Sequence, residues 1–163
     1  MANRRLIVIM GPSGCGKSTV ARALSDALSV PMLEGDDYHP AKNLEKLASG
    51  VPLDDTDRID WIAALLKSAT YGNAPVMVVA CSALTPYVQE CFSSALEFDV
   101  RFVYLNVSRD ELARRMQSRD HFMPVSLLDN QIEALSVPEG AHTIDAMADV
   151  ETITDAIISQ LKD

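Results

Sequence analysis

Short runs of almost continuous apolar residues alternate along this chain with longer stretches of helical periodicity. The apolar runs predict five strands, at residues 6–10, 31–34, 76–81, 101–106 and, more weakly, 141–145. Such runs are typical of parallel strands that are buried on both faces. Helices are expected over residues 17–29, 54–70, 86–95, 109–119, 126–135 and 150–161. Ser108 is suited to cap the fourth of these helices, and Asp149 or Thr152 is suited to open the last.

The order of these elements predicts an α/β fold with three layers, in which a five-stranded parallel sheet is flanked by helices. The chain has 163 residues, the length of one ordinary domain, and it shows no internal repeat or linker. Residues 1–163 are therefore expected to form a single domain. In folds of this class ligands collect at the carboxyl ends of the strands, so the candidate chemistry should lie where the predicted strands end.

A glycine-rich motif directly follows the first predicted strand. Residues 11–19 read Gly-Pro-Ser-Gly-Cys-Gly-Lys-Ser-Thr and match the phosphate-loop pattern G-x-x-x-x-G-K-[ST]. A strand that leads through such a turn into a helix aims backbone N–H groups and the positive helix end at one point, which favours a nucleoside triphosphate over a chance glycine turn. Lys17 can reach the β- and γ-phosphates, and the Ser18 hydroxyl can bind Mg²⁺. The residues expected to bind the nucleotide are Gly11, Ser13, Gly14, Cys15, Gly16, Lys17, Ser18 and Thr19.

The segment Glu34-Gly-Asp-Asp-Tyr-His-Pro40 begins where the second strand is expected to end. In a small phosphotransferase this position faces the γ-phosphate, so its carboxylates can act on a substrate hydroxyl or on Mg²⁺. Asp36 is the candidate base. In extended chain Glu34 and Asp36 project to the same side, so that one could hold metal-bound water while the other takes the acceptor hydroxyl. The alternative is that residues 35–37 form a solvated turn.

Arg58 lies one turn inside the helix expected over residues 54–70. Beside an acceptor pocket, its guanidinium would offer a bidentate fork to a carboxylate. The same spacing fits a surface arginine paired with an aspartate three or four residues earlier. Acidic residues at a helix start complement its dipole, and this explanation suffices for Asp54, Asp55 and Asp57. Trp61 is expected in the core.

The balance of charge narrows the possible partners. There are 14 lysine and arginine residues against 23 aspartate and glutamate residues, for a net charge of −9, so a nucleic-acid partner is not expected. Anionic substrates must then be held by local cations. No apolar stretch is long enough to span a membrane and the first residues run straight into a strand, so we expect no membrane anchor, no signal peptide and a cytoplasmic location. Cys15, Cys81 and Cys91 lack ligand spacing and are predicted to be plain thiols.

Several segments beyond the phosphate loop match a single family. They are residues 34–40, Asn43, Lys46, residues 50–53 and 55–58, Trp61, residues 81–84, 121–124 and 127–128, Gln131 and Pro138. With the phosphate loop they make the chain resemble the small P-loop gluconate kinases, the gluconokinases, over nearly its whole length. The resemblance implies a shikimate-kinase-like fold with a short mobile lid at about residues 115–126. It also implies ATP and Mg²⁺, transfer of phosphate to the terminal hydroxyl of D-gluconate to give 6-phospho-D-gluconate, and often a homodimer.

The same resemblance implies roles for individual residues. Asp36 would be the base, Glu34 would hold Mg²⁺ through water, and the sugar acid would contact Asp36, His39, Arg58 and Ser82. In the lid, Arg115 would lie against adenine and Arg119 would reach the transferring phosphates, where Arg119 would neutralise charge as a catalytic residue together with Lys17. The alternative for Arg114, Arg115 and Arg119 is a solvated helix end.

The chain departs from the family pattern at three places. Thr85 stands where the family usually has a lysine, residues 87–89 read Tyr-Val-Gln rather than Tyr-Arg-Asp, and Asp120 leads directly to His121 without the usual glycine. The first departure predicts weaker binding of gluconate than in relatives that keep the lysine. The alternatives are a kinase for another sugar acid or a shikimate-like acceptor, and a nucleotide-binding regulator without turnover.

Overall fold

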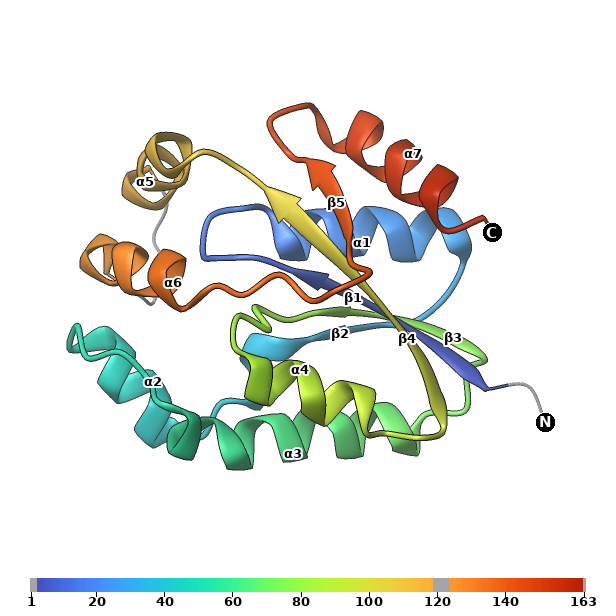
Figure 1. Ribbon diagram of the computed structural model, residues 1–163, viewed down its shortest axis with the longest axis horizontal. Coiled ribbons are helices and arrows are strands. Elements are labelled where there is room, and N and C mark those ends of the chain that lie inside the picture. The colour runs from blue at the N-terminus through green and yellow to red at the C-terminus, as the bar shows by residue number, and fades with distance from the viewer. Residues whose placement is uncertain (1–2, 119–123, 163) are drawn as a thin grey trace.

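A computed structural model describes residues 3–118 and 124–162 of the chain. Its centre is a five-stranded sheet in the order β2-β3-β1-β4-β5, in which every pair of neighbours is parallel (Figure 1). The strands are β1 (Arg4–Met10), β2 (Met32–Glu34), β3 (Val76–Ala80), β4 (Phe98–Asn106) and β5 (His142–Asp145). All five predicted strands and the parallel α/β architecture are thus confirmed.

Helices cover both faces of this sheet. The described residues form α1 (Lys17–Leu28), α2 (Ala41–Ala48), α3 (Asp55–Tyr71), α4 (Pro86–Ser93), α5 (Arg109–Gln117), α6 (Leu128–Ala134) and α7 (Val150–Gln160). Two short 3₁₀ helices, η1 (Gly35–Tyr38) and η2 (Val125–Leu127), precede α2 and α6. Figure 1 shows α1 and α7 on one side of the sheet and α3 and α4 on the other. The three predicted layers are therefore present.

The alternation of side chains along β1 builds a core on each face. Ile7 and Ile9 pack with residues of α1, α5 and α7. Leu6, Val8 and Met10 pack with residues of α3 and α4 instead. These five side chains are at most 2% exposed, as expected for the central strand of a sheet that is covered on both sides.

The segment after β2 differs from the prediction. The prediction that the chain is extended from Glu34 to Asp36 is wrong, because the 3₁₀ helix η1 begins at Gly35. A Cβ on Gly35 would lie 2.6 Å from the carbonyl oxygen of Ala80 in β3, so a glycine lets the chain turn off the sheet at this point. Helix α2 follows and has no counterpart in the prediction. Its Leu44 and Leu47, three residues apart, were the available signal.

The helix caps agree with the sequence. Ser108 accepts a hydrogen bond from the Glu111 backbone N–H at the start of α5. At the start of α7 the cap is Asp149, which accepts from the backbone N–H of Thr152 and decides between the two candidates. The helix predicted over residues 109–119 ends at Gln117, and Arg119 lies outside the described residues.

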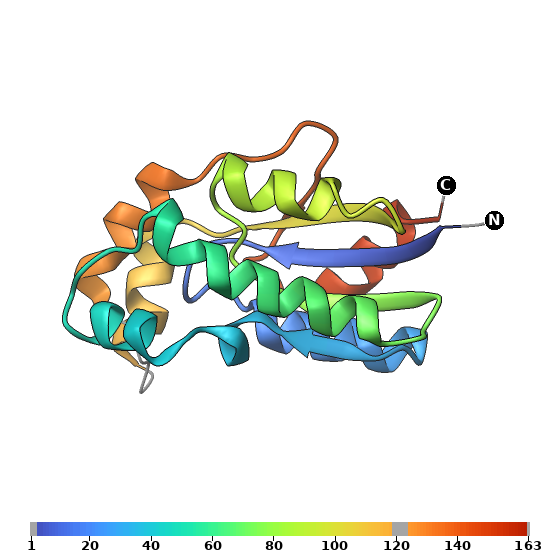
Figure 2. The same cartoon turned by 90° about the horizontal axis from the view of Figure 1, so that it is seen from below.

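The carboxyl ends of the strands point toward one end of the molecule. In Figure 2, α2, α5 and α6 gather at this end, beyond the tips of the strands. The loop from β1 to α1 and the turn after β2 emerge there as well. Among the described residues, no helix combines the length and apolar character needed to cross a bilayer.

Candidate active site

The phosphate loop turns sharply between β1 and α1. Gly11, Gly14 and Gly16 have φ angles of 150°, 87° and 96°, in a region that residues with a Cβ rarely adopt. Gly16 is the N-cap of α1 and offers no capping side chain, so the first backbone N–H groups of the helix are left for a ligand. Together with the helix dipole, these N–H groups favour an anion.

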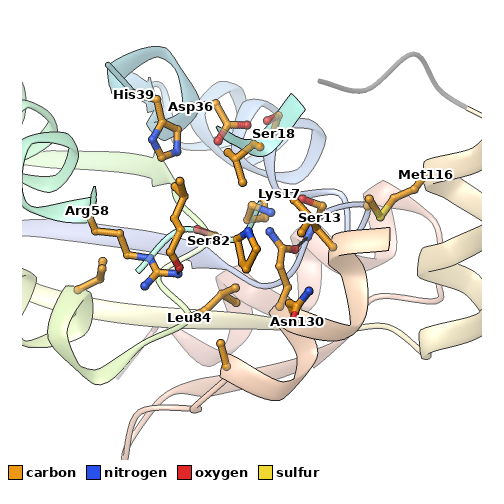
Figure 3. A pocket seen from close by; sticks show the side chains of 18 of the residues that line it. Ser13, Lys17, Ser18, Asp36, His39, Arg58, Ser82, Leu84, Met116 and Asn130 are labelled. Carbon is orange, nitrogen blue, oxygen red and sulfur yellow. Dashed lines mark hydrogen bonds between the residues drawn. The ribbon is translucent and has the colours of Figure 1, made fainter. Parts of the chain in front are cut away.

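A cleft of about 170 Å³ opens beside this loop. It brings together six of the side chains selected from the sequence, which are Lys17, Ser18, Asp36, His39, Arg58 and Ser82 (Figure 3). The loop and the start of α1 form one wall, and η1 with the first turns of α3 forms another. The sequence therefore selected residues from four separate elements that meet around one space.

Ser18 and Glu34 form a hydrogen-bonded pair at the edge of the phosphate loop. The Ser18 hydroxyl donates a hydrogen bond to Glu34 Oε2. Burial raises the pKa of Glu34, the hydrogen bond from Ser18 opposes this effect, and the nearby Asp36 carboxylate adds to it. A partly desolvated carboxylate beside a hydroxyl is a suitable oxygen donor set for Mg²⁺, which usually takes one or two protein ligands and completes its shell with phosphates and water. No cluster of three or more acidic, histidine or cysteine ligands occurs within residues 3–118 and 124–162.

His39 follows η1 and stacks on Trp61. The two ring centroids are 4.5 Å apart and the planes differ by 10°. Burial lowers the pKa of His39, the negative charge of Asp36 opposes this effect, and the positive charge of Arg58 adds to it. Trp61 is 2% exposed and belongs to the core, as expected, although its edge reaches the cleft.

Arg58 combines the two alternatives that its sequence position left open. It lines the cleft, and its Nη1 donates to Asp55 Oδ1 at 3.0 Å. Its Nη2 donates to the carbonyl oxygen of Leu53 at 2.9 Å. The side chain is 18% exposed, so Arg58 is paired with the aspartate three residues earlier without being a surface residue.

Thr85 is not among the residues that line the cleft. It is 8% exposed, and its hydroxyl donates to Asp55 Oδ1 at 3.1 Å. Asp55 therefore accepts hydrogen bonds from both Thr85 and Arg58. The capping explanation holds for the other two aspartates, because Asp54 and Asp57 form a capping box at the start of α3.

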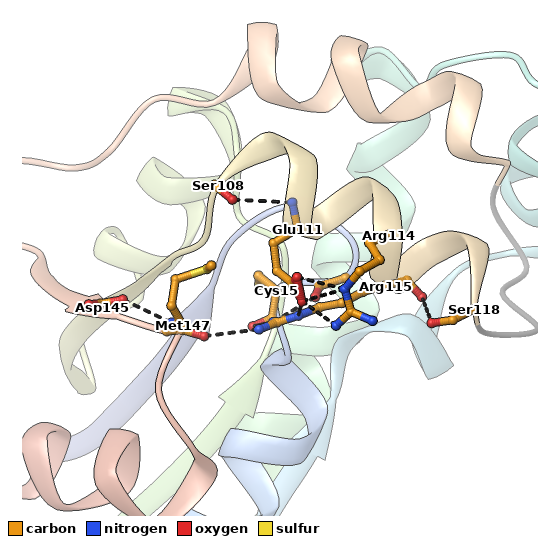
Figure 4. Close-up of polar contacts among 10 residues, drawn as sticks. Cys15, Ser108, Glu111, Arg114, Arg115, Ser118, Asp145 and Met147 are labelled. Atoms are coloured by element: carbon orange, nitrogen blue, oxygen red, sulfur yellow. Dashed lines mark hydrogen bonds and ion pairs between the residues drawn. The ribbon is translucent and has the colours of Figure 1, made fainter.

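Arg115 is hydrogen-bonded to the backbone of the phosphate loop (Figure 4). Its guanidinium donates to the carbonyl oxygens of Gly14 at 3.2 Å, Cys15 at 3.4 Å and Ala146 at 3.3 Å. A second cavity of about 290 Å³ lies on this side of the loop, between α5 and the start of α7. Gly16, Thr19 and Arg115 line both this cavity and the cleft. The two spaces are thus neighbours along the phosphate loop.

Its neighbour Arg114 is a different case. It is 68% exposed and pairs with Glu111, and this hydrogen bond is the main reason that the pKa of Glu111 falls to about 2. The solvated-helix interpretation therefore fits Arg114 and does not fit Arg115. Arg119, the predicted catalytic arginine of the lid, lies outside the described residues.

Gln131 contacts the phosphate loop although the motifs did not assign it a role. Its Oε1 accepts a hydrogen bond from the Ser13 backbone N–H at 2.7 Å, which ties α6 to the loop. Gln131 matches the family pattern, but the pattern did not reveal its contact with a residue 118 positions away. Asn43 and Asp55 also match the family pattern, but the contact of Asn43 with Asp57 and that of Asp55 with Thr85 were not predicted.

The loop cysteine lacks the properties of an activated nucleophile. Cys15 and Cys81 are both buried, and burial raises the pKa of each thiol, that of Cys81 to about 12. A thiolate is the reactive form of cysteine, so neither side chain is activated at neutral pH. The chemistry of the cleft must therefore rest on its charged and hydroxyl groups.

A phosphate loop at the end of the central strand, with a carboxylate across a cleft, defines the class as a P-loop phosphotransferase. A family model described as "AAA domain" matches residues 6–138. Gluconokinase from Gluconobacter oxydans is 41% identical over 82% of this chain and 76% of its own length, and a probable gluconokinase from Xenopus tropicalis is 38% identical over 93% and 90%. The chain belongs to the gluconokinase family.

The solved structures agree in fold. A gluconokinase from Sinorhizobium meliloti 1021 superposes with a TM-score of 0.83 at 36% identity, covering 98% of this chain and 92% of that one. A shikimate kinase from Bacteroides thetaiotaomicron has a TM-score of 0.70 at 21% identity over 98% of this chain and 99% of its own. At that identity the second likeness shows the fold alone.

Proposed function

We propose that this chain phosphorylates D-gluconate with ATP to give 6-phospho-D-gluconate. The observation that carries the proposal is one cleft in which the phosphate loop faces Asp36, His39 and Arg58. The named gluconokinases among the relatives support the acceptor. An anion-binding loop and a carboxylate base on facing walls suit transfer of a phosphoryl group to a hydroxyl.

ATP would extend across the phosphate loop from one cavity to the other. The base would enter the second cavity beside Arg115, and the phosphates would follow the loop past Gly16 and Thr19 into the cleft. Ser18 would bind Mg²⁺ directly and Glu34 through water. The metal supplies charge neutralisation on the phosphate oxygens.

Lys17 and Asp36 would then perform the transfer. Asp36 aligns the terminal hydroxyl of the sugar acid and takes its proton, while the hydroxyl oxygen forms a bond to the γ-phosphorus and the bond from that phosphorus to the bridging oxygen breaks. Lys17 neutralises charge on the γ-phosphoryl group, and ADP leaves with the bridging oxygen. Arg119 stays a prediction for the same role, because it lies outside the described residues.

The carboxylate of the sugar acid would bind at Arg58. Asp55 and the Leu53 carbonyl orient this guanidinium, which leaves its remaining N–H groups for a ligand. His39 and Ser82 would contact hydroxyl groups of the acceptor in the same cleft. A homodimer, a cytoplasmic location, a single domain over residues 1–163 and a lid at about residues 115–126 likewise stay predictions from the sequence.

A coupled assay of ADP release tests this proposal. ATP consumption is measured with gluconate, a panel of other sugar acids and shikimate, in the wild type and in Lys17→Ala. We expect the rate to depend on gluconate and to fall at least about 10²-fold in Lys17→Ala, because a positioned cation is lost from the transition state. Lys42→Ala is the matched control, since Lys42 pairs with Asp60 on the surface and should not affect turnover. Turnover with a different acid, or ATP binding without turnover, would contradict the proposal.

A further inference from the structure

The ring of His39 is fixed in its plane. Trp61 stacks on it with a centroid distance of 4.5 Å. Trp61 is itself anchored, because its Nε1–H donates to the carbonyl oxygen of Gly35 at 2.8 Å. The ring also lines the cleft, so one of its edges is within reach of a ligand there (Figure 3).

Asn43, a fully buried residue of α2, contacts the other edge of this ring. Its Nδ2 lies 2.9 Å from the carbonyl oxygen of Asp57 and 3.3 Å from Nδ1 of His39. A carbonyl oxygen can only accept, so the amide must present its NH₂ group on this side. Rotating the amide by half a turn would place its oxygen against the Asp57 oxygen. The orientation of Asn43 is thus determined by its surroundings.

The second hydrogen of this NH₂ group points at Nδ1 of His39. Nδ1 must then accept, and it carries no proton. A neutral imidazole with a bare Nδ1 carries its proton on Nε2. The buried Oδ1 of Asn43 has no hydrogen-bond partner among the described residues, so this amide gives up an acceptor contact while both of its donors are used.

We propose that Asn43 is a positioning residue that fixes His39 as a neutral Nε2–H donor to an acceptor oxygen in the cleft. The inference rests on the proposed function for the identity of the acceptor and refines it, because a donor at this place selects a ligand with a hydroxyl or carboxylate oxygen. It assigns His39 to recognition through one hydrogen bond rather than through positive charge.

The charges around the ring are compatible with a neutral state. Among the described residues, Asp36 from η1 and Arg58 from α3 act on the ring with opposite effects, and burial lowers its pKa. Protonation would add a hydrogen to Nδ1 directly opposite the NH₂ group of Asn43. Two donors would then face each other, so Asn43 itself opposes the charged form.

Nuclear magnetic resonance on the ligand-free protein tests the tautomer. Long-range ¹H–¹⁵N spectra of ¹⁵N-histidine-labelled protein distinguish protonated from bare ring nitrogens, and the His39 signals are assigned from their absence in His39→Gln. In the wild type we expect a bare Nδ1 at neutral pH and a midpoint of titration below that of free histidine. In Asn43→Asp a carboxylate replaces the donor, so Nδ1 should become protonated and the midpoint should rise by about one unit or more.

Asn130→Asp is the matched control for this measurement, because it introduces the same carboxylate elsewhere in the cleft wall and leaves the donor to His39 in place. A protonated Nδ1 in the wild type would overturn the assignment. Equal responses to the two substitutions would overturn the role of Asn43.

Kinetics of two substitutions test recognition separately. The amide of His39→Gln can place an N–H near the position of Nε2, whereas the shorter amide of His39→Asn cannot. We expect the KM for gluconate to stay within about 3-fold in His39→Gln and to rise about 10-fold in His39→Asn, the effect of one lost hydrogen bond, with the KM for ATP unchanged. Equal gluconate KM values in both variants and the wild type would remove the donor role. Absence of gluconate turnover in the wild type would contradict the proposed function, whereas the ligand-free spectra would still decide the tautomer.

Discussion

Asp36 and Asp37 are neighbours in η1 and have the same chemistry, yet within the described residues Asp36 lines the cleft and Asp37 does not. If Asp36 is the base, Asp36→Asn should lower kcat by about 10²-fold or more, because an amide cannot take the hydroxyl proton. ATP affinity, measured by calorimetry, should be retained. Asp37→Asn is the matched control and should leave kcat near the wild-type value. Equal kcat values in the two variants would make Asp36 a turn residue.

Thr85 gives a second test at the scale of one residue. The sequence predicts that the lysine missing at this position weakens gluconate binding, and the structure places Thr85 against Asp55, the carboxylate that also holds Arg58. In Thr85→Lys the ammonium would neutralise Asp55 and leave more of the Arg58 charge for a ligand. The KM for gluconate should fall about 10-fold or more, as for one charge-assisted hydrogen bond, without a change in the KM for ATP.

Thr85→Val separates the added cation from the lost hydroxyl. This substitution removes the bond to Asp55 and keeps the side-chain volume. It should change the KM for gluconate much less than Thr85→Lys does. If the lysine leaves gluconate binding unaltered, the family's cation at this position has been replaced in its function by another group of the chain.

The raised pKa of Glu34 predicts that the stability of the protein depends on pH. Its pKa is raised in the folded protein, mainly by burial. The folded state therefore holds this proton more firmly than the unfolded state, and the contribution of Glu34 to stability is greatest below its unfolded pKa and is lost as the pH rises through its folded pKa. Glu34→Gln removes this loss. The free energy of unfolding is measured with urea at pH 7 and at pH 4.5 for wild type and Glu34→Gln. Glu34→Gln should gain stability relative to wild type when the pH is raised from 4.5 to 7. A difference that does not vary with pH would show that Glu34 is not desolvated.

At the scale of elements, the start of α3 positions both Arg58 and Trp61. Asp54 accepts from the Asp57 N–H at 2.9 Å, and Asp57 in turn accepts from the Asp54 N–H at 3.0 Å and from Lys46 of α2 at 2.6 Å. Asp54→Ala should lower the free energy of unfolding by about 1 kcal/mol, the usual effect of a lost N-cap, and should raise the KM for gluconate as Arg58 loses its fixed support.

Asp149→Ala is the control for this substitution. Asp149 caps α7 through the Thr152 N–H at 2.8 Å, on a helix that does not carry the acceptor residues. Its stability loss in denaturant unfolding should be similar, with an unchanged KM for gluconate. A rise of KM in both variants would mean that the effect comes from general loosening and not from the position of α3.

The elements also show what sequence patterns can and cannot predict. The central strands β1, β3 and β4 were found because they are nearly continuous apolar runs, as a covered parallel sheet requires, whereas β5, which buries only Ile144, gave a weaker signal. Helix α2 was missed because its eight residues expose most side chains and bury only Asn43 and Leu47. The turn at Gly35 was missed because its cause is a close approach to Ala80 in another strand. Local pattern carries no information about such contacts.

At the scale of the whole molecule, the two cavities beside the phosphate loop predict that both substrates bind before the phosphoryl group is transferred. They share Gly16, Thr19 and Arg115, so under the proposed function ATP and the acceptor would be bound at the same time and the phosphoryl group would pass directly between them. Initial rates measured with both substrates varied should give intersecting double-reciprocal plots. Parallel plots, the pattern of a covalent enzyme intermediate, would contradict direct transfer.

The candidate site was predictable to the extent that its residues fall in local motifs. Lys17 and Ser18 follow from the phosphate loop alone, and Asp36 follows from its place after the second strand. The polar contacts of Asn43 and Gln131 with the rest of the site could not be predicted from these motifs. Asn43 reaches the Asp57 carbonyl 14 positions away, and Gln131 reaches Ser13 118 positions away. These partners are set by packing between elements, which one sequence does not display.

The central position of β1 has a consequence during synthesis of the chain. β1 leaves the ribosome before its neighbours β3 and β4, and its first residue Arg4 pairs with Phe98. Until residue 106 has emerged, the nascent chain therefore carries an apolar strand with at least one unpaired edge. Chaperones that shield hydrophobic segments have their longest opportunity in this interval. Slow translation at any point before residue 106 has emerged would prolong this interval, whereas slow translation after that point would leave it unchanged.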